Sequence, residues 1–270
     1  MITFIPTPIG NIQDITIRAM KLFEKATLFL CEDTRHTKRL LRLLEERFDM
    51  VYPNAAFYSF NEHNGQMRLD ELSSIFANNE VIYVSDAGMP VISDPGQLLV
   101  EYAQKNNIKY DVLPGASAVT TAYAASGFEE GKFLFNAFLP HKGKERAVAL
   151  IEAMNNGYNT VVYESPHRLL KLLNEIEDMD ECRELFLAKE ISKKYQTYYH
   201  GIVKELNTKL KELTIRGEWV VVIRAKDITE KSLSFAEVLN LDLPPKPKAK
   251  LLAQLSDKST KEWYQELINS

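Results

Sequence analysis

The sequence predicts an α/β protein, because short β-rich runs alternate with helical patterns along most of the chain. Its 270 residues are 45% hydrophobic and 26% charged, which is typical of a globular protein with a sizeable core. This length corresponds to one large domain or two medium ones. The composition excludes a disordered, collagen-like or disulfide-rich chain.

Nine runs rich in β-branched and aromatic residues are the expected strands. In chain order they are Ile2–Ile5, Thr27–Cys31, Ala56–Phe60, Val81–Ser85, Tyr110–Leu113, Phe133–Phe138, Thr160–Tyr163, Leu185–Ala188 and Glu218–Arg224. The segments between them favour helices such as Ile17–Ala26 and Thr34–Glu46, for which Thr16 and Thr34 are candidate N-caps. Because ligands of open α/β sheets bind outside the carboxyl ends of the strands, the residues just after each strand are the most informative.

A change of composition near 127–132 (GFEEGK) divides the α/β part of the chain. There the small-residue stretch Gly115–Gly127 gives way to the aromatic run FLFNAF. The sequence therefore predicts a first lobe over 1–128 and a second lobe over 129–225.

A polar segment over 226–234 (KDITEKSLS) follows the last expected strand. Beyond it lie a proline-rich connector and two short helical patterns, Ala249–Leu255 and Thr260–Ile268. The sequence therefore predicts a small C-terminal helical module over 234–270.

The charge and the cysteines exclude several classes of protein. The net charge of −4 gives no general attraction to free nucleic acid, so an RNA partner would have to be held by local patches. Cys31 and Cys182 lie far apart with no CxxC pair or His cluster, so we expect buried thiols rather than a disulfide or a metal site. No basic leader precedes the first strand and no apolar run approaches the roughly 18 residues of a membrane span. We expect a cytoplasmic protein without a membrane partner.

The first two strands end in polar or rigid motifs. Pro6–Asn11 (PTPIGN) is either a tight exit from the strand or a turn that exposes backbone groups to a ligand, and without GxGxxG it disfavours a Rossmann dehydrogenase. In Cys31–Thr37 (CEDTRHT), helix capping explains Asp33 or Thr34. Arg35 and His36 are cations at the unfavourable end of the helix dipole, which favours a functional role.

Two further loops of the first half favour ligand binding. Ser85–Gly96 (SDAGMPVISDPG) has two aspartates, two glycines and two prolines in twelve residues, more than a plain connection needs. Leu113–Val119 (LPGASAV) opens a helix with small residues, which either admit a ligand or allow tight packing on the sheet.

Polar groups also follow the strands of the second half. In Tyr163–Arg168 (YESPHR), Pro166 suits the first helical position and Ser165 the N-cap, which leaves Glu164, His167 and Arg168 near the sheet edge. Lys189–Glu190 precedes ISKKYQTYYHG, whose basic and Tyr residues either hold phosphates and stack on bases or form a half-exposed strand.

These motifs occur together in the order and spacing of one family. PTPIGN, EDTRHT, SDAGMPVISDPG, LPGASA, FLP, YESPHR, AKE and GEWVVVI cover about residues 1–225 almost continuously. The sequence resembles the ribosomal RNA small subunit methyltransferase I family, a branch of the tetrapyrrole methylase superfamily. The resemblance implies a two-lobed α/β fold that binds S-adenosylmethionine in the cleft between the lobes. It also implies a homodimer, and methyl transfer to the ribose 2′-OH of cytidine 1402 in 16S rRNA.

The resemblance also implies which residues form the site. The cofactor residues carried over by motif are Pro8, Ile9, Ala87, Gly88, Met89, Ile92, Ser117, Ala118, Glu164 and Ile191. A ribose hydroxyl is a poor nucleophile, so a base would remove or orient its proton, and Asp33, Glu164 and Glu190 are the candidates. Arg35, Arg168 and Lys189 are expected to grip phosphate or carboxylate groups.

Local charge favours RNA more than the net charge does. Lys189–Arg216 holds seven Lys/Arg and three acids, and Leu243–Ser270 holds five Lys and three acids. An assembled small ribosomal subunit has a preformed shape that the protein could recognise in addition to its charge, so it is the expected substrate. Two alternatives stay open: a methylase of a tetrapyrrole-like small molecule, against which EDTRHT and YESPHR argue, and a ribosome-assembly factor without catalytic activity.

Overall fold

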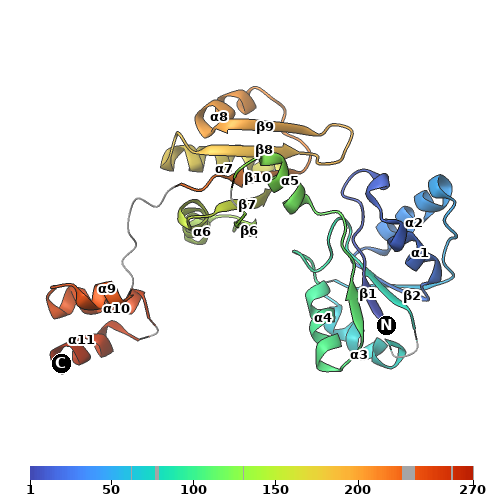
Figure 1. Ribbon diagram of the computed structural model, residues 1–270, viewed down its shortest axis with the longest axis horizontal. Coiled ribbons are helices and arrows are strands. Elements are labelled where there is room, and N and C mark those ends of the chain that lie inside the picture. Colours follow the sequence, from blue (N-terminus) through green and yellow to red (C-terminus); the bar gives the residue numbers. More distant parts are fainter. Residues whose placement is uncertain (62, 77–78, 130, 227–234, 257, 270) are drawn as a thin grey trace. The chain divides into compact units, whose positions relative to one another are not determined.

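A computed structural model describes residues 1–270 except 62, 77–78, 130, 227–234, 257 and 270 (Figure 1). It confirms the predicted α/β class. The chain forms two compact units, Met1–Lys226 and Asp227–Ser270, and each is described by itself.

The first sheet is parallel, with the strand order β3-β2-β4-β1-β5. Its strands are β1 (Ile2–Phe4), β2 (Leu28–Cys31), β3 (Ala56–Ser59), β4 (Val81–Val84) and β5 (Tyr110–Val112). Because all five strands run the same way, their carboxyl ends and the loops that follow meet at one edge of the sheet.

Four helices cover the two faces of this sheet (Figure 1). Helices α1 (Ile17–Lys25) and α2 (Thr34–Phe48) pack on one face, and α3 (Gly65–Phe76) and α4 (Gly96–Lys105) pack on the other. A 3-10 turn, η1 (Ile12–Asp14), precedes α1. Thr16 caps α1 as predicted, since its hydroxyl accepts from the Ala19 N–H. Asp33 caps α2 instead of Thr34, because its carboxylate accepts from the Arg35 N–H.

The second sheet is mixed, with the strand order β6-β7-β10-β8-β9. Its strands are β6 (Phe133–Phe138), β7 (Asn159–Glu164), β8 (Glu184–Lys189), β9 (Thr197–Ile202) and β10 (Trp219–Ile223). Only β6 and β7 pair in parallel. The edge strand β9 is absent from the nine expected strands, and it confirms the alternative interpretation of the Tyr-rich run as a partly exposed strand.

Helices also cover both faces of the second sheet. One face packs against α6 (Gly143–Asn155), α7 (Pro166–Met179) and α8 (Val203–Lys211). The other face packs against α5 (Ala118–Ser126), which follows the last strand of the first sheet. Helix α7 begins at Pro166 with Ser165 as N-cap residue, as the sequence predicts.

The C-terminal unit is a small helical bundle. It contains α9 (Phe235–Asn240), α10 (Pro245–Gln254) and α11 (Thr260–Asn269). Val238, Ala249, Leu252 and Trp263 form its core. The sequence predicts two of these helices, and α9 is additional. Of the polar segment predicted over 226–234, residues 227–234 lie outside the described residues.

The two cysteines have different environments. Cys31 is buried, and burial raises the pKa of its thiol to about 12 despite a hydrogen bond from Thr37. Cys182 is exposed, so the prediction that it is buried was wrong; it lies in the turn between α7 and β8, which neither element covers. Among the described helices, none combines the length and the apolar character that crossing a membrane requires.

Candidate functional site

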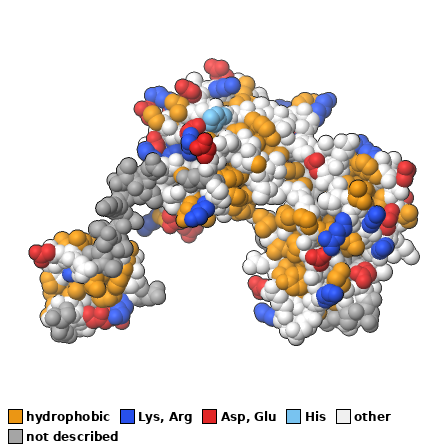
Figure 2. Space-filling model, viewed as in Figure 1, with side chains coloured by type: hydrophobic (Ala, Val, Ile, Leu, Met, Phe, Trp, Pro, Cys, Tyr) orange, Lys and Arg blue, Asp and Glu red, His pale blue; other side chains and the backbone are white. Residues whose placement is uncertain are grey.

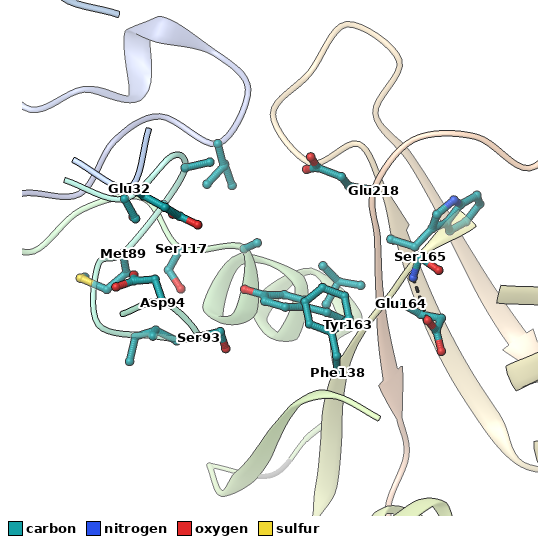
Figure 3. A pocket seen from close by; sticks show the side chains of 18 of the residues that line it. Glu32, Met89, Ser93, Asp94, Ser117, Phe138, Tyr163, Glu164, Ser165 and Glu218 are labelled. Carbon is teal, nitrogen blue, oxygen red and sulfur yellow. Dashed lines mark hydrogen bonds between the residues drawn. The ribbon is translucent and has the colours of Figure 1, made fainter. Parts of the chain in front are cut away.

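A cavity of about 380 Å³ lies at the carboxyl edge of the first sheet (Figure 3). The first sheet contributes the loops after β1, β2 and β4 and the start of α5. The second sheet contributes the ends of β6 and β7 and the start of β10. The volume is within the range of small-molecule sites, and it lies where open α/β sheets bind ligands.

The loop after β4 shapes one wall of the cavity. It pairs with the loop after β1, because Thr7 and Gly88 exchange two backbone hydrogen bonds of 3.0 Å. Gly88 has φ +84° and a Cβ there would lie 3.1 Å from Ile9 Cγ2, so the position needs glycine. Val91 and Ser93 also have positive φ, a costly conformation for a β-branched residue such as Val91.

Asp94 holds this strained loop in place. Its carboxylate accepts hydrogen bonds from the Val91 N–H at 2.7 Å, the Gly96 N–H at 2.8 Å and the Tyr83 hydroxyl at 2.9 Å. Burial raises the pKa of Asp94 and outweighs these three bonds, which favour the ionised form. Backbone strain that is retained at such a loop is typical of a ligand site.

The charges that line the cavity all have one sign. Glu32, Asp94, Glu164 and Glu218 line it, and no Lys or Arg is among the described residues that do so (Figure 3). Carboxylates attract a cationic ligand and repel a phosphate. The cavity therefore suits a positively charged small molecule better than a dinucleotide.

S-adenosylmethionine fits this arrangement. Its sulfonium and ammonium groups are cations that the acidic lining would stabilise. The Ser85 hydroxyl on the cavity wall is buried without a hydrogen-bond partner in the described chain, as expected of a group that a ligand completes. The small residues Ala87, Gly88 and Ala118 leave room for the cofactor to approach the backbone of the cavity wall closely.

The structure brings most of the predicted cofactor residues together. Eight of them line the cavity: Ile9, Ala87, Gly88, Met89, Ile92, Ser117, Ala118 and Glu164. Pro8 and Ile191 do not line it. Ile191 is buried in the apolar cluster that Ile9 and Val119 share, so it lies behind the wall.

Glu164 is the centre of a buried ion-pair network. One carboxylate oxygen accepts from the Ser165 N–H and pairs with Arg168 Nε, each at 2.8 Å. The other lies 3.3 Å from Arg146 Nη2, and Arg146 also binds Glu175 at 2.8 Å. The side chains of Glu164 and Arg146 are 0% and 2% exposed. Both oxygens of Glu164 are therefore occupied by the protein.

Asp33 and Arg35 form an exposed pair outside the cavity. Arg35 Nη2 lies 2.5 Å from Asp33 Oδ2, and the Arg35 side chain is 86% exposed. The hydrogen bonds from Arg35 lower the pKa of Asp33 well below its ordinary value. The neighbouring His36 Nδ1 lies 2.9 Å from Asp86 Oδ2, and the Asp86 N–H donates to Glu32. These contacts join the start of α2 to the cavity loop.

Lys189 is the last residue of β8 and Glu190 follows it, and both adjoin the cavity through their neighbours. Lys189 Nζ lies 5.7 Å from the ring centre of Trp219, a cavity residue. Glu190 accepts from the Glu218 N–H at 2.9 Å and from Lys193 at 3.0 Å. Although partial burial opposes ionisation, these bonds lower the pKa of Glu190. Neither Lys189 nor Glu190 lines the cavity itself.

Sequence reasoning missed several residues of the site. Glu32, Ser85, Phe138, Tyr163, Glu218 and Trp219 line the cavity without being singled out. The antiparallel register of β10, which sets Trp219 opposite both Glu164 and Lys189, brings Glu218 and Trp219 there. Arg146 was also missed, since an arginine in the first turn of a helix carries no signal of burial.

The fold and family comparisons define the class of protein. Residues 1–207 match the family described as Tetrapyrrole (Corrin/Porphyrin) Methylases. Two solved structures share the fold at 16% sequence identity. The cobalamin biosynthetic enzyme cobalt precorrin-4 methyltransferase gives a TM-score of 0.59 over 83% of this chain and 94% of its own. The methyltransferase CobJ gives 0.60 over 83% and 93%. The chain is a methyltransferase of the tetrapyrrole methylase class.

Curated relatives identify the branch. The Helicobacter pylori J99 protein named ribosomal RNA small subunit methyltransferase I is 46% identical, over 98% of this chain and 96% of that protein. The proteins of the same name from Campylobacter fetus and Thermotoga maritima are 43% and 41% identical. They cover 99% and 82% of this chain, and 100% and 96% of their own lengths. The chain therefore belongs to the ribosomal RNA small subunit methyltransferase I family, which confirms the resemblance noted in the sequence.

Proposed function

We propose that this chain transfers the methyl group of S-adenosylmethionine to the ribose 2′-OH of cytidine 1402 in 16S rRNA. The observation that carries the proposal is the acid-lined cavity, with no Lys or Arg among the described residues that line it. Glu164 and Glu218 already pair with cations of the protein, so Glu32 and Asp94 are the lining acids that would favour a cationic methyl donor. The full-length similarity to proteins named for small-subunit ribosomal RNA supports the choice of substrate.

The chain's main task is alignment. The bound cofactor supplies a methyl group that its sulfonium has already activated. Ser117 and Ala118 at the start of α5 and Ala87–Met89 in the loop after β4 would hold it. Phe138, which is 55% exposed, and Tyr163 pack together at the cavity with ring centres 5.4 Å apart. They would orient the incoming nucleotide so that its 2′-oxygen faces the methyl group in line with the leaving sulfur.

The acids proposed from the sequence differ in what they would contribute. Both oxygens of Glu164 are occupied by arginines and a backbone N–H, so Glu164 would keep the cavity wall rigid. Asp33 and Glu190 have lowered pKa values, which makes them weak bases. Neither Asp33 nor Glu190 lines the cavity, so we propose that they orient groups of the substrate outside it and do not take the proton of the ribose hydroxyl.

Of the three cations proposed as clamps, Arg35 and Lys189 would exchange their present partners for RNA. Arg35 pairs with Asp33, Arg168 pairs with Glu164, and Lys189 rests on Trp219. Arg35 is the most exposed of the three and would contact a phosphate with the smallest rearrangement. Arg168 is 18% exposed, so its contribution would be to position the Glu164 loop.

We further propose that the substrate is the assembled small ribosomal subunit and that the enzyme is a cytoplasmic homodimer. Folded rRNA presents the 2′-OH in one geometry, which removes part of the ordering cost at the site. The C-terminal unit holds the exposed residues Lys246 and Lys250 and would make an additional contact with the particle. A chain that ends after Ala225 would then keep cofactor affinity and methylate particles poorly.

The test is to incubate the chain with radiolabelled S-adenosylmethionine and one of three acceptors. These are small ribosomal subunits that lack the modification, naked 16S rRNA and a porphyrinoid precursor. We expect label in the subunits, less label in naked rRNA at matched salt, and none in the porphyrinoid. Label in the porphyrinoid alone would favour the small-molecule alternative. Cofactor binding without any methyl transfer would favour an assembly factor.

The cofactor site is tested separately with Ala118→Trp, which places an indole in the cavity. Calorimetry should give one cofactor site per chain for the wild type and an affinity at least tenfold lower for the variant. The matched control is Ala124→Trp, because Ala124 lies on the exposed side of the same helix. Equal affinity of Ala118→Trp and the wild type would remove the cavity as the cofactor site.

A further inference from the structure

Helix α2 carries a row of cations along one exposed side. Arg35, Lys38, Arg39 and Arg42 recur at the spacing of one helical face, and all four are exposed. We refer to these four residues as the α2 stripe. Figure 2 shows several Lys and Arg side chains over the region of α1 and α2, with acidic side chains among them. At 1.5 Å per residue the stripe is about 10 Å long.

Most of the stripe is not neutralised by the protein. Among the described residues, no carboxylate lies within 4 Å of Lys38, Arg39 or Arg42, and Lys38 rests 5.0 Å from the ring centre of Phe57. Arg35 alone is paired, with Asp33. Placing four like charges on one helical face is unfavourable for the isolated protein. A row of this kind is typical of a surface that binds a polyanion.

The cations near the cavity in the second lobe are in a different state. Lys193 pairs with Glu190 and Glu218, and Arg168 pairs with Glu164. Lys204, farther along the basic run, pairs with Glu181. Lys193 and Lys204 are therefore compensated by carboxylates of the protein, whereas Arg39 and Arg42 have no such partner among the described residues.

The stripe also begins beside the cavity. Asp86, in the cavity loop after β4, accepts from the Asp33 N–H at 3.1 Å and lies 2.9 Å from His36 Nδ1. Glu32, two residues before α2, lines the cavity. A strand held on the stripe would thus run away from the cavity mouth, and its phosphates would stay outside the acidic interior.

We propose that the α2 stripe binds the phosphate backbone of the RNA strand whose target nucleotide enters the cavity. This inference rests on the proposed function and adds to it the surface that holds the substrate. Arg39 and Arg42 are the main contacts because they are exposed and unpaired in the described chain. Lys38 adds charge, and Arg35 lies at the end next to the cavity. The contacts are to phosphates, so they strengthen binding without selecting a base.

The experiment measures binding to small ribosomal subunits and to a 16S rRNA fragment around the target, at salt concentrations from 50 to 200 mM. The variant is Arg39→Gln/Arg42→Gln. The control is Lys105→Gln/Lys109→Gln, which removes the same charge from exposed positions ahead of β5, at the amino edge of the sheet. We expect the stripe variant to bind the RNA fragment at least tenfold more weakly at low salt. The slope of log K against log salt should be shallower by about 1.4, which is about 0.7 for each of the two lost single-strand phosphate contacts. The control should match the wild type.

Cofactor affinity, measured by calorimetry, should be unchanged in both variants, which shows that the fold is intact. Equal RNA affinity and salt slope for the stripe variant and the wild type would overturn the stripe while leaving the methyl transfer intact. A wild type that binds RNA through the stripe without methylating it would support the stripe and overturn the proposed function. A wild type that binds neither the subunits nor the fragment would overturn both.

Discussion

Two segments of this chain contain the same kinds of residue and use them differently. Glu32–Thr37 follows β2, and Glu164–Arg168 begins at the last residue of β7. Each combines an acid, a hydroxyl residue, a histidine and an arginine at the start of a helix. After β2 the arginine of the ion pair is exposed at 86% and Asp33 is 22% exposed. After β7 the ion pair is buried, with Glu164 at 0% and Arg168 at 18%.

The difference comes from what covers each helix start. Helix α6 places Arg146 against Glu164, and Arg146 in turn binds Glu175 of α7 and the Pro140 carbonyl. No described element covers Arg35 in this way. The segment after β7 therefore stabilises the cavity wall from inside, while the segment after β2 leaves Arg35 accessible to a partner. Substitutions in the two segments should therefore differ strongly in their effect on folding.

The largest expected effect is that of Arg146→Ala. It leaves Glu164 and Glu175 with less compensation in a buried setting, so we expect the free energy of unfolding to fall by about 3–5 kcal/mol. Urea denaturation measures it. Lys144→Ala, an exposed change on the same helix, is the control and should stay within about 0.5 kcal/mol of the wild type. A loss below about 1 kcal/mol for Arg146→Ala would mean that the buried network stabilises no more than a surface pair.

Glu164→Gln should have the next largest effect. The amide keeps the shape of the side chain but removes the charge that faces two arginines, so we expect a loss of about 2–3 kcal/mol of stability. The exposed Glu152→Gln on α6 is the matched control. Glu164 was predicted as a cofactor residue. A variant with unchanged stability but much weaker cofactor binding would contradict the structural role and favour direct contact.

Asp33→Asn should leave the free energy of unfolding close to that of the wild type. Asparagine caps a helix as well as aspartate does, so the substitution removes only the exposed pair with Arg35. The same urea titration applies. A loss as large as that of Glu164→Gln would erase the distinction between the two segments.

The smallest expected effect concerns how the free energy of unfolding depends on pH when Asp33 is replaced. The pKa of Asp33 is lowered from an ordinary 3.8 by its hydrogen bonds with Arg35. A lowered folded-state pKa contributes stability that is present above the unfolded pKa and is lost as pH falls through the folded value. The stability of the wild type should therefore fall more steeply than that of Asp33→Asn below about pH 4. Identical slopes in urea titrations from pH 5 to 3 would show that the pair has no effect on folding.

Much of the fold follows from local pattern. The alternation of strands and helices, the Thr16 cap and the start of α7 at Pro166 are all visible in the sequence, because each depends on neighbouring residues. The sequence did not decide whether the Tyr-rich run forms the strand β9, because a basic run with many Tyr residues is compatible both with an RNA-binding segment and with an edge strand. Helix α9 was not predicted. Its residue Val238 packs against Ala249, Leu252 and Trp263 of the other two helices, and these contacts are not visible in the local sequence.

The site was predictable where it consists of loops that directly follow parallel strands. These include Ala87–Met89 and Ser117–Ala118, which line the cavity. Glu218 and Trp219 could not be predicted, because they reach the cavity through the antiparallel pairing of β10 with β7 and β8. The local sequence also cannot show whether a cation is already paired. That distinction separates Arg39 and Arg42 from Lys193.

The central claim is that the cavity delivers a methyl group to one ribose oxygen. The most direct measurement is to digest small ribosomal subunits methylated by this chain and to locate the new methyl group by mass spectrometry and reverse-transcription mapping. We expect one methyl group per particle, on the 2′-oxygen of cytidine 1402. A methyl group on a base, or on the ribose of another nucleotide, would contradict it.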